Sequence, residues 1–391
     1  MNILFLLGVY PNYGGTEKVT TILANEFTRR GHRISIVSFE QPFPELAERE
    51  LDSSIRLHSL SYPVYSADNR RRLRGIVREE HTDIIINQWC LPYYVTQLIN
   101  YARKGTRCKL VAVLHGVPDK SKRIIVAADA IAQAKSTLKR LFCKAKYQII
   151  QAVIQRSIRY VYSHSDRYVV LSEGFIKTLQ QYTGLHETPN LLSIGNPVTI
   201  PVDYGTDFIA EKRKQILYVG RMDMENKRVN RIVEAWEDLH VRYKDWELIL
   251  VGDGPHRKQL QQYAAAHQIK RITFTGFVKE EPIRFYKQAT VLMLTSDLEG
   301  FGLVIVEGMS YGVIPVVYGS YAAVYDIITD GVDGYITPMP YSREVTVSRL
   351  RAIMDDPDRA RSMAEAARDK SHQFSLPAIL AQWEQLFQSL Q

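Results

Sequence analysis

Residues 291–307 read Val291-Leu-Met-Leu-Thr-Ser-Asp-Leu-Glu-Gly-Phe-Gly-Leu-Val-Ile-Val-Glu307 and carry the clearest signal of the fold. The continuous apolar run Val291–Leu294 is typical of a strand that is buried on both faces of a parallel sheet. Glycines at 300 and 302 then indicate a turn, and an apolar run with helical character follows. A buried strand, a turn and a helix form the repeating unit of doubly wound α/β domains.

Short apolar runs alternate with helical patterns along the rest of the chain. The predicted strands are Ile3–Leu7, Ile34–Phe39, Ile84–Asn87, Lys109–Leu114, Arg167–Leu171, Gln215–Val219, Glu247–Val251, Ile272–Thr275, Val291–Leu294 and Ile314–Val317. A Pro- and Gly-rich segment at 185–212 interrupts this rhythm and predicts a linker. With 391 residues, the chain is long enough for two domains. We predict an α/β protein with an N-terminal domain at 1–195, a second domain at 196–373 and a terminal helix at 374–391.

Composition excludes several protein classes. Hydrophobic residues make up 46% and charged residues 24%, which is typical of globular proteins, and no apolar run is long enough to span a membrane. The apolar start Met1–Val9 lacks a basic leader and is predicted to be a buried strand. Three widely spaced cysteines (Cys90, Cys108, Cys143) form neither a disulfide framework nor a metal motif. These features favour a cytoplasmic location.

Positive charge is concentrated in one segment. Residues 101–160 hold 14 Lys or Arg and two acids, whereas the whole chain has a net charge of +8. Within this segment, 135–162 is predicted to be an amphipathic helix with basic side chains. Such a helix can lie on an anionic membrane surface, peripheral at the inner face of the cytoplasmic membrane, or it can be a core helix with a solvated basic face. Nucleic acid is disfavoured because no zinc-finger, RRM or basic-zipper pattern occurs.

Doubly wound sheets bind ligands outside the carboxyl ends of their strands, so the residues that follow each strand are site candidates. Gly220-Arg-Met-Asp-Met-Glu-Asn-Lys227 follows one strand, and its cations Arg221 and Lys227 can clamp a diphosphate. The glycine turn at 300–302 exposes amides at a helix N-terminus, which can bind an anion without a metal. The neighbouring carboxylates of Glu299 and Glu307 would repel a phosphate, so each must have another task, such as holding sugar hydroxyls. Glu307 can instead be an ordinary solvated helix residue.

The N-terminal half offers fewer candidates. His115 precedes Gly116 at the carboxyl end of a predicted strand, which favours a site role in which it hydrogen-bonds a substrate hydroxyl over that of an ordinary loop histidine. Gly14 and Gly15 follow the first strand and allow the backbone to approach a ligand closely. The only spacing that invites a metal, Asp356-Pro-Asp358, lies in a polar connection and is predicted to be a turn.

Together, Gly220-Arg221 with Lys227, the turn Val251-Gly-Asp-Gly-Pro255 and above all Glu299-x7-Glu307 resemble the retaining glycosyltransferases of family 4, or glycosyl transferases group 1. The resemblance extends over nearly the whole chain. It implies the GT-B fold, in which two Rossmann-like doubly wound domains face a central cleft and a C-terminal helix crosses back to the first domain. One residue departs from the pattern, because Arg228 follows Lys227 where the family often has glycine.

The resemblance also implies roles for individual residues. Arg221 and Lys227 would hold the diphosphate, Glu307 the ribose hydroxyls and Glu299 the donor sugar, and His115 would lie near that sugar. The implied catalytic residues are His115, Arg221, Lys227 and Glu299. The implied nucleotide-sugar-binding residues are Gly14, Gly15, Gly220, Arg221, Lys227, Phe277, Val278, Glu299, Gly300, Phe301, Gly302, Leu303, Val304 and Glu307.

The expected activity is transfer of a hexose or N-acetylhexosamine, with retention, from a nucleotide sugar to a saccharide or lipid-linked saccharide. UDP is the expected nucleotide, and surface polysaccharide, lipopolysaccharide or glycan assembly is the expected setting. Neither a metal nor a cofactor is expected. A sugar phosphorylase, a nucleotide-sugar epimerase and a non-catalytic nucleotide-sugar-binding protein remain alternatives. A dehydrogenase does not fit, because the first strand is not followed by Gly-x-Gly-x-x-Gly.

Overall fold

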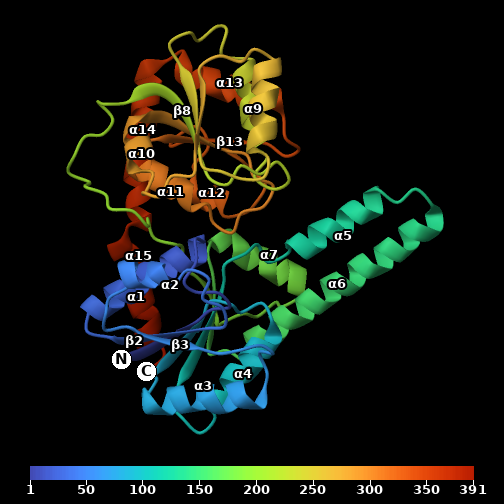
Figure 1. Cartoon of the computed structure of the whole chain (residues 1–391), viewed down its shortest axis with the longest axis vertical. Helices are drawn as coiled ribbons and strands as arrows, with labels where there is room; N and C mark the ends of the chain where they lie inside the picture. Colours follow the sequence, from blue (N-terminus) through green and yellow to red (C-terminus); the bar gives the residue numbers. More distant parts are fainter. The chain divides into compact units, whose positions relative to one another are not determined.

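The computed structural model describes all residues, 1–391, and the chain forms two compact units (Figure 1). Unit 1 comprises Met1–Gly195 and Leu380–Gln391, and unit 2 comprises Asn196–Ile379. Each unit contains one sheet in which all strand pairs are parallel. The predicted α/β fold class, with two Rossmann-like doubly wound domains, is therefore confirmed. None of the helices combines the length and apolar character that crossing a bilayer requires.

The sheet of unit 1 has seven strands in the order β3-β2-β1-β4-β5-β6-β7. Its strands are β1 (Asn2–Leu6), β2 (Arg33–Ser38), β3 (Arg56–Ser59), β4 (Ile84–Asn87), β5 (Lys109–Leu114), β6 (Arg167–Val170) and β7 (Leu191–Ser193). Its helices are α1 (Gly15–Arg29), α2 (Pro44–Glu50), α3 (Ala67–Glu79), α4 (Tyr93–Arg103), α5 (Lys122–Ala132), α6 (Thr137–Ser163) and α7 (Glu173–Thr183).

Alternating residues of the central strand β1 face opposite helix layers. Leu4 and Leu6 belong to a buried cluster with residues of α3 and α4. Phe5 points the other way and stacks on Phe27 of α1, with ring centroids 6.4 Å apart. Because both faces of the strand are covered, its sequence is continuously apolar, as predicted.

Helices α5 and α6 pack side by side and project from the rest of unit 1 (Figure 1). We call this pair, residues 122–163, the α5–α6 hairpin. The predicted helix at 135–162 corresponds to α6 (Thr137–Ser163), whose N-cap Ser136 accepts a hydrogen bond from the Lys139 amide. Only Ile154, Ser157, Ile158 and Val161 of α6 are buried, so the N-terminal half of the helix contributes little to the core.

The sheet of unit 2 has six strands in the order β10-β9-β8-β11-β12-β13. Its strands are β8 (Arg213–Val219), β9 (Glu247–Val251), β10 (Ile272–Gly276), β11 (Ala289–Leu294), β12 (Ile314–Tyr318) and β13 (Tyr335–Thr337). Its helices are α8 (Val229–Glu237), α9 (Arg257–Ala266), α10 (Ile283–Gln288), α11 (Leu303–Ser310), α12 (Val324–Ile327), α13 (Arg343–Met354) and α14 (Pro357–Ser371), followed by the 3₁₀ turn η1 (His372–Phe374).

The last helix, α15 (Leu376–Gln388), returns the chain to unit 1, which it joins at Leu380. Its Phe387 ring lies 5.3 Å from that of Phe27 on α1, and Glu384 forms an ion pair of 2.6 Å with Arg30. The sequence therefore predicted correctly that the terminal helix crosses back to the first domain.

Three short strands at or beside the sheet edges are missing from the sequence prediction: β3, β7 and β13. Strand β7 lies inside the segment 185–212 that was predicted to be a linker, so that prediction was wrong for Leu191–Ser193. None of these three strands contains more than two consecutive apolar residues, so none forms a recognisable apolar run, and β3 is largely exposed.

Candidate functional site

The strand order of unit 2 reverses direction between β8 and β11, which are adjacent in the sheet. In doubly wound sheets a crevice opens at this point, outside the carboxyl ends of the two strands. Residues 220–228 follow β8, and residues 295–302 follow β11. The two segments with the strongest sequence signals are therefore brought together by the fold.

Glycines allow the turns at this edge to approach one another. Gly254, after β9, would place a Cβ 2.5 Å from the Met222 carbonyl oxygen, and Gly252 lies against the Gly220 carbonyl. Gly220, Gly252 and Gly276 also have positive φ angles, of 154°, 128° and 79°. A side chain at Gly252 or Gly254 would push the Arg221 segment away from its neighbours.

An ion pair joins the two segments. The Lys227 ammonium donates to Oε1 of Glu299, and both side chains are largely buried. The backbone supports this contact, because the Asp297 amide donates to the Asn226 carbonyl (2.8 Å) and the Asn226 side chain donates to the Leu298 carbonyl (3.2 Å). An ammonium has three donors, so Lys227 can keep this contact and still bind an anion.

Arg228 occupies the position where the family often has glycine. The backbone at Arg228 has a φ of 51°, which explains the preference for glycine at this position. This left-handed conformation disfavours side chains other than glycine. The Arg228 guanidinium donates to Asp297, which also accepts a hydrogen bond of 2.7 Å from Arg231. Neither Arg231 nor Asp297 was identified as a site residue from sequence. Their partners lie more than 60 residues away, and no local motif connects them.

The turn after β11 leads into α11, whose N-cap is Gly302 with a φ of 92°. The amides of a first helical turn have no partner within the helix, so Leu303 and Val304 present donors at this end. Tyr321 lies against Gly302, since a Cβ on this glycine would be 2.8 Å from the Tyr321 hydroxyl. The hydroxyls of Tyr321 and Ser296 are buried without a hydrogen-bond partner. Burial, with the Glu299 charge nearby, holds the pKa of Tyr321 well above its usual value.

Glu307, on the same helix, is 7% exposed. Its Oε1 accepts a hydrogen bond from Thr199 and its Oε2 accepts one of 2.9 Å from Tyr286 of α10. A carboxylate in apolar surroundings requires partners, and two hydroxyls supply them. Neither hydroxyl was identified from sequence. Glu307 is therefore held by groups other than those around Lys227 and Glu299.

The remaining predicted residues of unit 2 lie at the same edge of the sheet. Arg221 follows Gly220 and is exposed, and Tyr218 donates to its carbonyl at 2.7 Å. Phe277 follows β10 with 59% of its surface exposed, and Val278 is half-buried.

Asp356 belongs to the Asp356-Pro-Asp358 spacing that was predicted to be a turn. It caps α14 by accepting a hydrogen bond of 3.0 Å from the Arg359 amide.

In unit 1 the strand order reverses between β1 and β4. His115 follows β5, next to β4, and its Nε2 donates to the side-chain oxygen of Gln88, which follows β4. Burial lowers the pKa of His115 to about 4. The imidazole is therefore neutral near pH 7, and Nδ1 is left as an acceptor for a hydroxyl. Gln88 was not identified from sequence.

Gly14 and Gly15 form the N-terminus of α1 in unit 1, with Gly14 as its N-cap. The Glu17 carboxylate folds back against Gly14, where a Cβ would collide with it. Burial raises the pKa of Glu17. The first turn of α1 is thus accessible at Gly15, which is exposed, and partly covered at Gly14.

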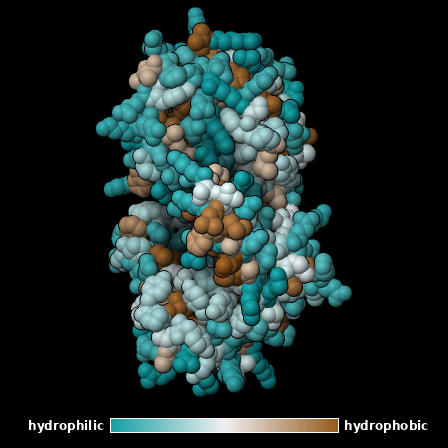
Figure 2. All heavy atoms as spheres, turned by 90° about the vertical axis from the view of Figure 1, so that its right-hand side faces the viewer, coloured by the Kyte–Doolittle hydropathy of each residue, from teal (hydrophilic) through white to brown (hydrophobic).

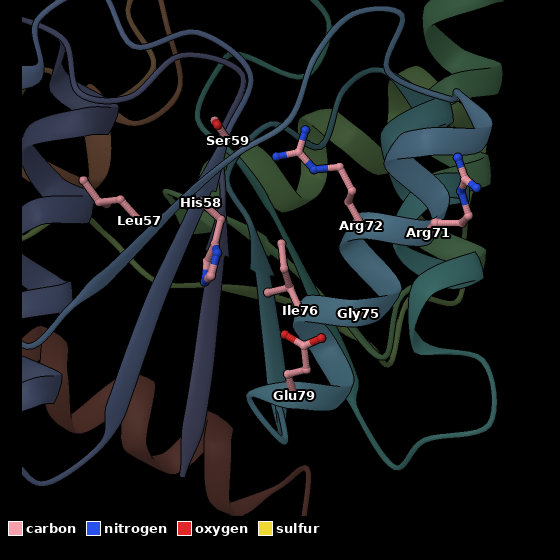
Figure 3. A pocket seen from close by; sticks show the side chains of 8 residues that line it. All are labelled: Leu57, His58, Ser59, Arg71, Arg72, Gly75, Ile76 and Glu79. Carbon is pink, nitrogen blue, oxygen red and sulfur yellow. The ribbon is translucent and has the colours of Figure 1, made fainter.

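Unit 1 also contains a cavity of about 560 Å³ between β3 and α3. His58 on the strand is paired with Glu80 at 2.8 Å. Arg72 extends from α3 toward Ser59, while Arg71 points away (Figure 3). None of the residues predicted to form a site lines this cavity. No group of three or more His, Cys, Asp or Glu side chains is arranged to hold a metal ion.

Two family models match the chain, one for each sheet. Glycosyltransferase Family 4 matches residues 13–191, and Glycosyl transferases group 1 matches residues 206–370.

Similar proteins have been described in several bacteria. The chain is 24% identical over 387 residues to N-acetyl-alpha-D-glucosaminyl L-malate synthase of Bacillus anthracis, which covers 97% of this chain and 94% of that protein. It is 20% identical over 390 residues to the amylovoran biosynthesis glycosyltransferase AmsD of Erwinia amylovora. That match covers 98% of this chain and 99% of AmsD. Among solved structures, Anabaena Alr3699/HepE in complex with UDP is similar, with a TM-score of 0.75, 19% identity and full coverage of both chains.

Proposed function

Because the chain belongs to the glycosyl transferases of group 1, a family of GT-B glycosyltransferases, we propose that it transfers a hexose or N-acetylhexosamine from a UDP-sugar to a saccharide or lipid-linked saccharide acceptor. Relatives with named roles support this setting, among them an amylovoran biosynthesis glycosyltransferase and a transferase of Campylobacter jejuni whose name includes a PP-undecaprenol-linked saccharide. The similar Anabaena structure contains UDP, which supports the choice of nucleotide.

The ion pair between Lys227 and Glu299, at the reversal point of the second sheet, is the observation that carries the proposal. In the proposed complex, Lys227 and the exposed Arg221 bind the diphosphate, together with the first-turn amides of α11. Glu299 orients Lys227 and accepts hydrogen bonds from hydroxyls of the donor sugar. Glu307 binds the ribose hydroxyls, with Thr199 and Tyr286 fixing the orientation of its carboxylate.

The proposed transfer keeps the anomeric configuration. The acceptor oxygen forms a bond to the anomeric carbon on the face from which the diphosphate leaves, and the hydroxyl proton passes to the departing phosphate oxygen. Catalysis then depends on positioning and on stabilising the charge of the leaving diphosphate. His115, neutral at pH 7, accepts a hydrogen bond from a sugar hydroxyl and does not contribute a charge. We propose that neither a metal nor a cofactor takes part.

The donor site is tested by calorimetric titration of UDP and GDP, with EDTA present, into the wild type and Glu307→Ala. We expect micromolar UDP binding that Glu307→Ala weakens at least tenfold. Glu344→Ala is the matched control, since Glu344 is an exposed glutamate of the same unit, at the start of α13. Failure of the wild type to bind UDP would contradict the proposed donor, and a requirement for a divalent metal would contradict the metal-independent mechanism.

Retention is tested separately, on the product. Once a UDP-sugar from a panel is found to be consumed, the coupling constant of the anomeric proton in the product reports its configuration by NMR. We expect the product to have the same configuration as the donor. Inversion would exclude same-face attack, while leaving the donor-site assignment intact.

A further inference from the structure

The apolar side chains at the tip of the α5–α6 hairpin are unusually exposed. Every residue from 135 to 149 is exposed except Cys143 and Tyr147, which are half-buried. Leu138, Leu141 and Phe142 are 81%, 65% and 71% exposed. Six of the 17 large apolar side chains that are exposed in the whole chain lie in this hairpin. A concentration of this kind marks an interaction surface.

These side chains form a continuous patch. Leu138, Phe142, Ile149 and Val153 follow one another at helical spacing on α6, and Leu141 lies beside them. Figure 2 faces the side from which the hairpin projects, and brown, apolar atoms gather near the centre of that view. None of these side chains is among the buried residues of α6, so the patch lies outside the core of unit 1.

The charge of the hairpin is strongly one-sided. Residues 122–163 hold nine Lys or Arg and one acid, Asp129, so their net charge equals the +8 of the entire chain. Helix α6 itself contains no acid. Cations surround the apolar patch, with Lys139 and Arg140 directly preceding Leu141 in the sequence.

A groove runs between the two helices, with a volume of about 590 Å³. Its walls are mainly apolar and include Val126 and Ala130 of α5 and Phe142 and Ile150 of α6. Four basic residues also line it: Lys122, Arg123, Lys139 and Lys146. Long basic side chains commonly cover apolar surface with their methylene stems while their charged ends reach outward. The groove therefore combines space for an apolar chain with cations for a phosphate.

We propose that the α5–α6 hairpin docks on an anionic phospholipid bilayer, with Leu138, Leu141 and Phe142 inserted among the acyl chains. The groove receives one acyl chain of an anionic lipid, and its basic residues bind that lipid's phosphate. Interfacial amphipathic helices bury their apolar face roughly 5–10 Å into the boundary between headgroups and acyl chains. The inference rests on the proposed function in one respect: a lipid-linked acceptor would lie at the surface of the same bilayer.

A second copy of the chain is a less suitable partner for this surface. Two hairpins with the same charge of +8 would repel each other at close range. An anionic bilayer matches both properties at once, because it offers negative headgroups around the cations and hydrocarbon below the apolar tip.

Vesicle flotation of the full-length protein tests the proposal. We compare vesicles of phosphatidylcholine with vesicles that also contain phosphatidylglycerol. Each basic residue near an anionic surface changes partitioning about fivefold, so Lys139→Gln combined with Lys146→Gln should weaken binding about 25-fold. Phe142→Asp should weaken it at least tenfold, since it removes the aromatic ring and adds a negative charge. Binding to neutral vesicles that equals binding to anionic ones would overturn the proposal.

Matched variants on unit 2 control for general effects of charge and exposure. Val241 is 70% exposed, and Lys244 and Lys258 are exposed, so Val241→Asp and the pair Lys244→Gln with Lys258→Gln alter similar residues elsewhere. We expect both controls to bind vesicles as the wild type does. If they lose binding to the same extent as the hairpin variants, the hairpin is not the docking element.

Insertion itself is measured with Phe142→Trp. A tryptophan at the tip should be quenched by lipids that carry bromine on their acyl chains, and this quenching should be absent in Val241→Trp. Lack of quenching in Phe142→Trp would overturn insertion. Self-association of the wild type that Phe142→Asp abolishes, without vesicle binding, would assign the patch to a second copy instead.

Failure of this inference is distinguishable from failure of the proposed function. Hairpin variants should bind UDP as the wild type does, because the nucleotide is assigned to unit 2. Vesicle binding by a wild type that binds no nucleotide would leave the inference standing and contradict the proposed donor.

Discussion

A left-handed backbone at Arg228 links the geometry of a single residue to the candidate site. With a φ of 51°, this position costs a side chain about 1–2 kcal/mol relative to glycine. The partly exposed ion pair with Asp297 offsets roughly 1 kcal/mol or less of that cost. Arg228→Gly should therefore raise the free energy of unfolding by about 0–2 kcal/mol, whereas Arg228→Val should lower it by about 2 kcal/mol.

Urea unfolding of the two variants measures the difference. Equal stability of the Gly and Val variants would show that the backbone conformation at 228 is not the determining factor. Asp297→Asn is a useful companion, since it removes the charge partner of Arg228 and leaves the backbone requirement unchanged.

The neutral imidazole of His115 predicts a pH dependence of stability. Its pKa is about 4 in the folded chain, below the usual value of about 6.5 that applies when the chain is unfolded. As pH falls below 6.5, the unfolded state takes up a proton that the folded state does not, so stability is lost between about pH 6.5 and 4. The loss has an upper limit of about 3 kcal/mol and is smaller because the residue keeps some contact with water.

His115→Asn removes this titration and should flatten the fall in unfolding free energy across that range. His186→Asn is the control, because His186 is exposed on the same unit. Chemical unfolding at a series of pH values gives the slopes. A wild-type slope that matches that of His115→Asn would show that the imidazole is not shielded from protonation.

At the scale of whole elements, the turns after β8 and β9 depend on close backbone approach. Gly254→Ala would place a methyl group 2.5 Å from the Met222 carbonyl and 2.7 Å from its amide nitrogen. We expect the variant to lose about 1–3 kcal/mol of stability, and UDP affinity to fall because the Arg221 segment is displaced. Gly75→Ala is the control, since its nearest contact in α3 is 3.7 Å and alanine favours a helix. Unchanged UDP affinity in Gly254→Ala would separate this turn from the donor site.

The elements that the sequence predicts well are those whose signal is local. Continuous apolar runs predicted the central strands, and the glycines at 300 and 302, with the apolar run after them, predicted a turn followed by a helix. Gln88, Asp297 and Tyr286 carried no such signal, because their partners lie 27, 69 and 21 residues away. Contacts of this kind exist only once the parallel sheet has aligned the ends of separate strands.

For the molecule as a whole, the return of α15 ties the end of the chain to the stability of unit 1. Phe387 is 2% exposed and packs on Phe27 of α1. Truncating a large buried aromatic side chain to alanine costs about 3–5 kcal/mol, a large share of the 5–15 kcal/mol that stabilises a typical domain. Phe387→Ala should therefore lower the stability of unit 1, while unit 2 retains nucleotide binding.

Hydrogen exchange followed by mass spectrometry resolves the two units. In Phe387→Ala, the amides of α1 and the central strands of unit 1 should exchange faster, and those of β8 and β11 should not change. Gln388→Ala is the control, because this neighbouring side chain is exposed on the same helix. Equal loss of protection in both units would mean that they unfold as one cooperative body. Then the last helix would stabilise the donor-binding unit as well, and deletion of residues 380–391 should abolish UDP binding.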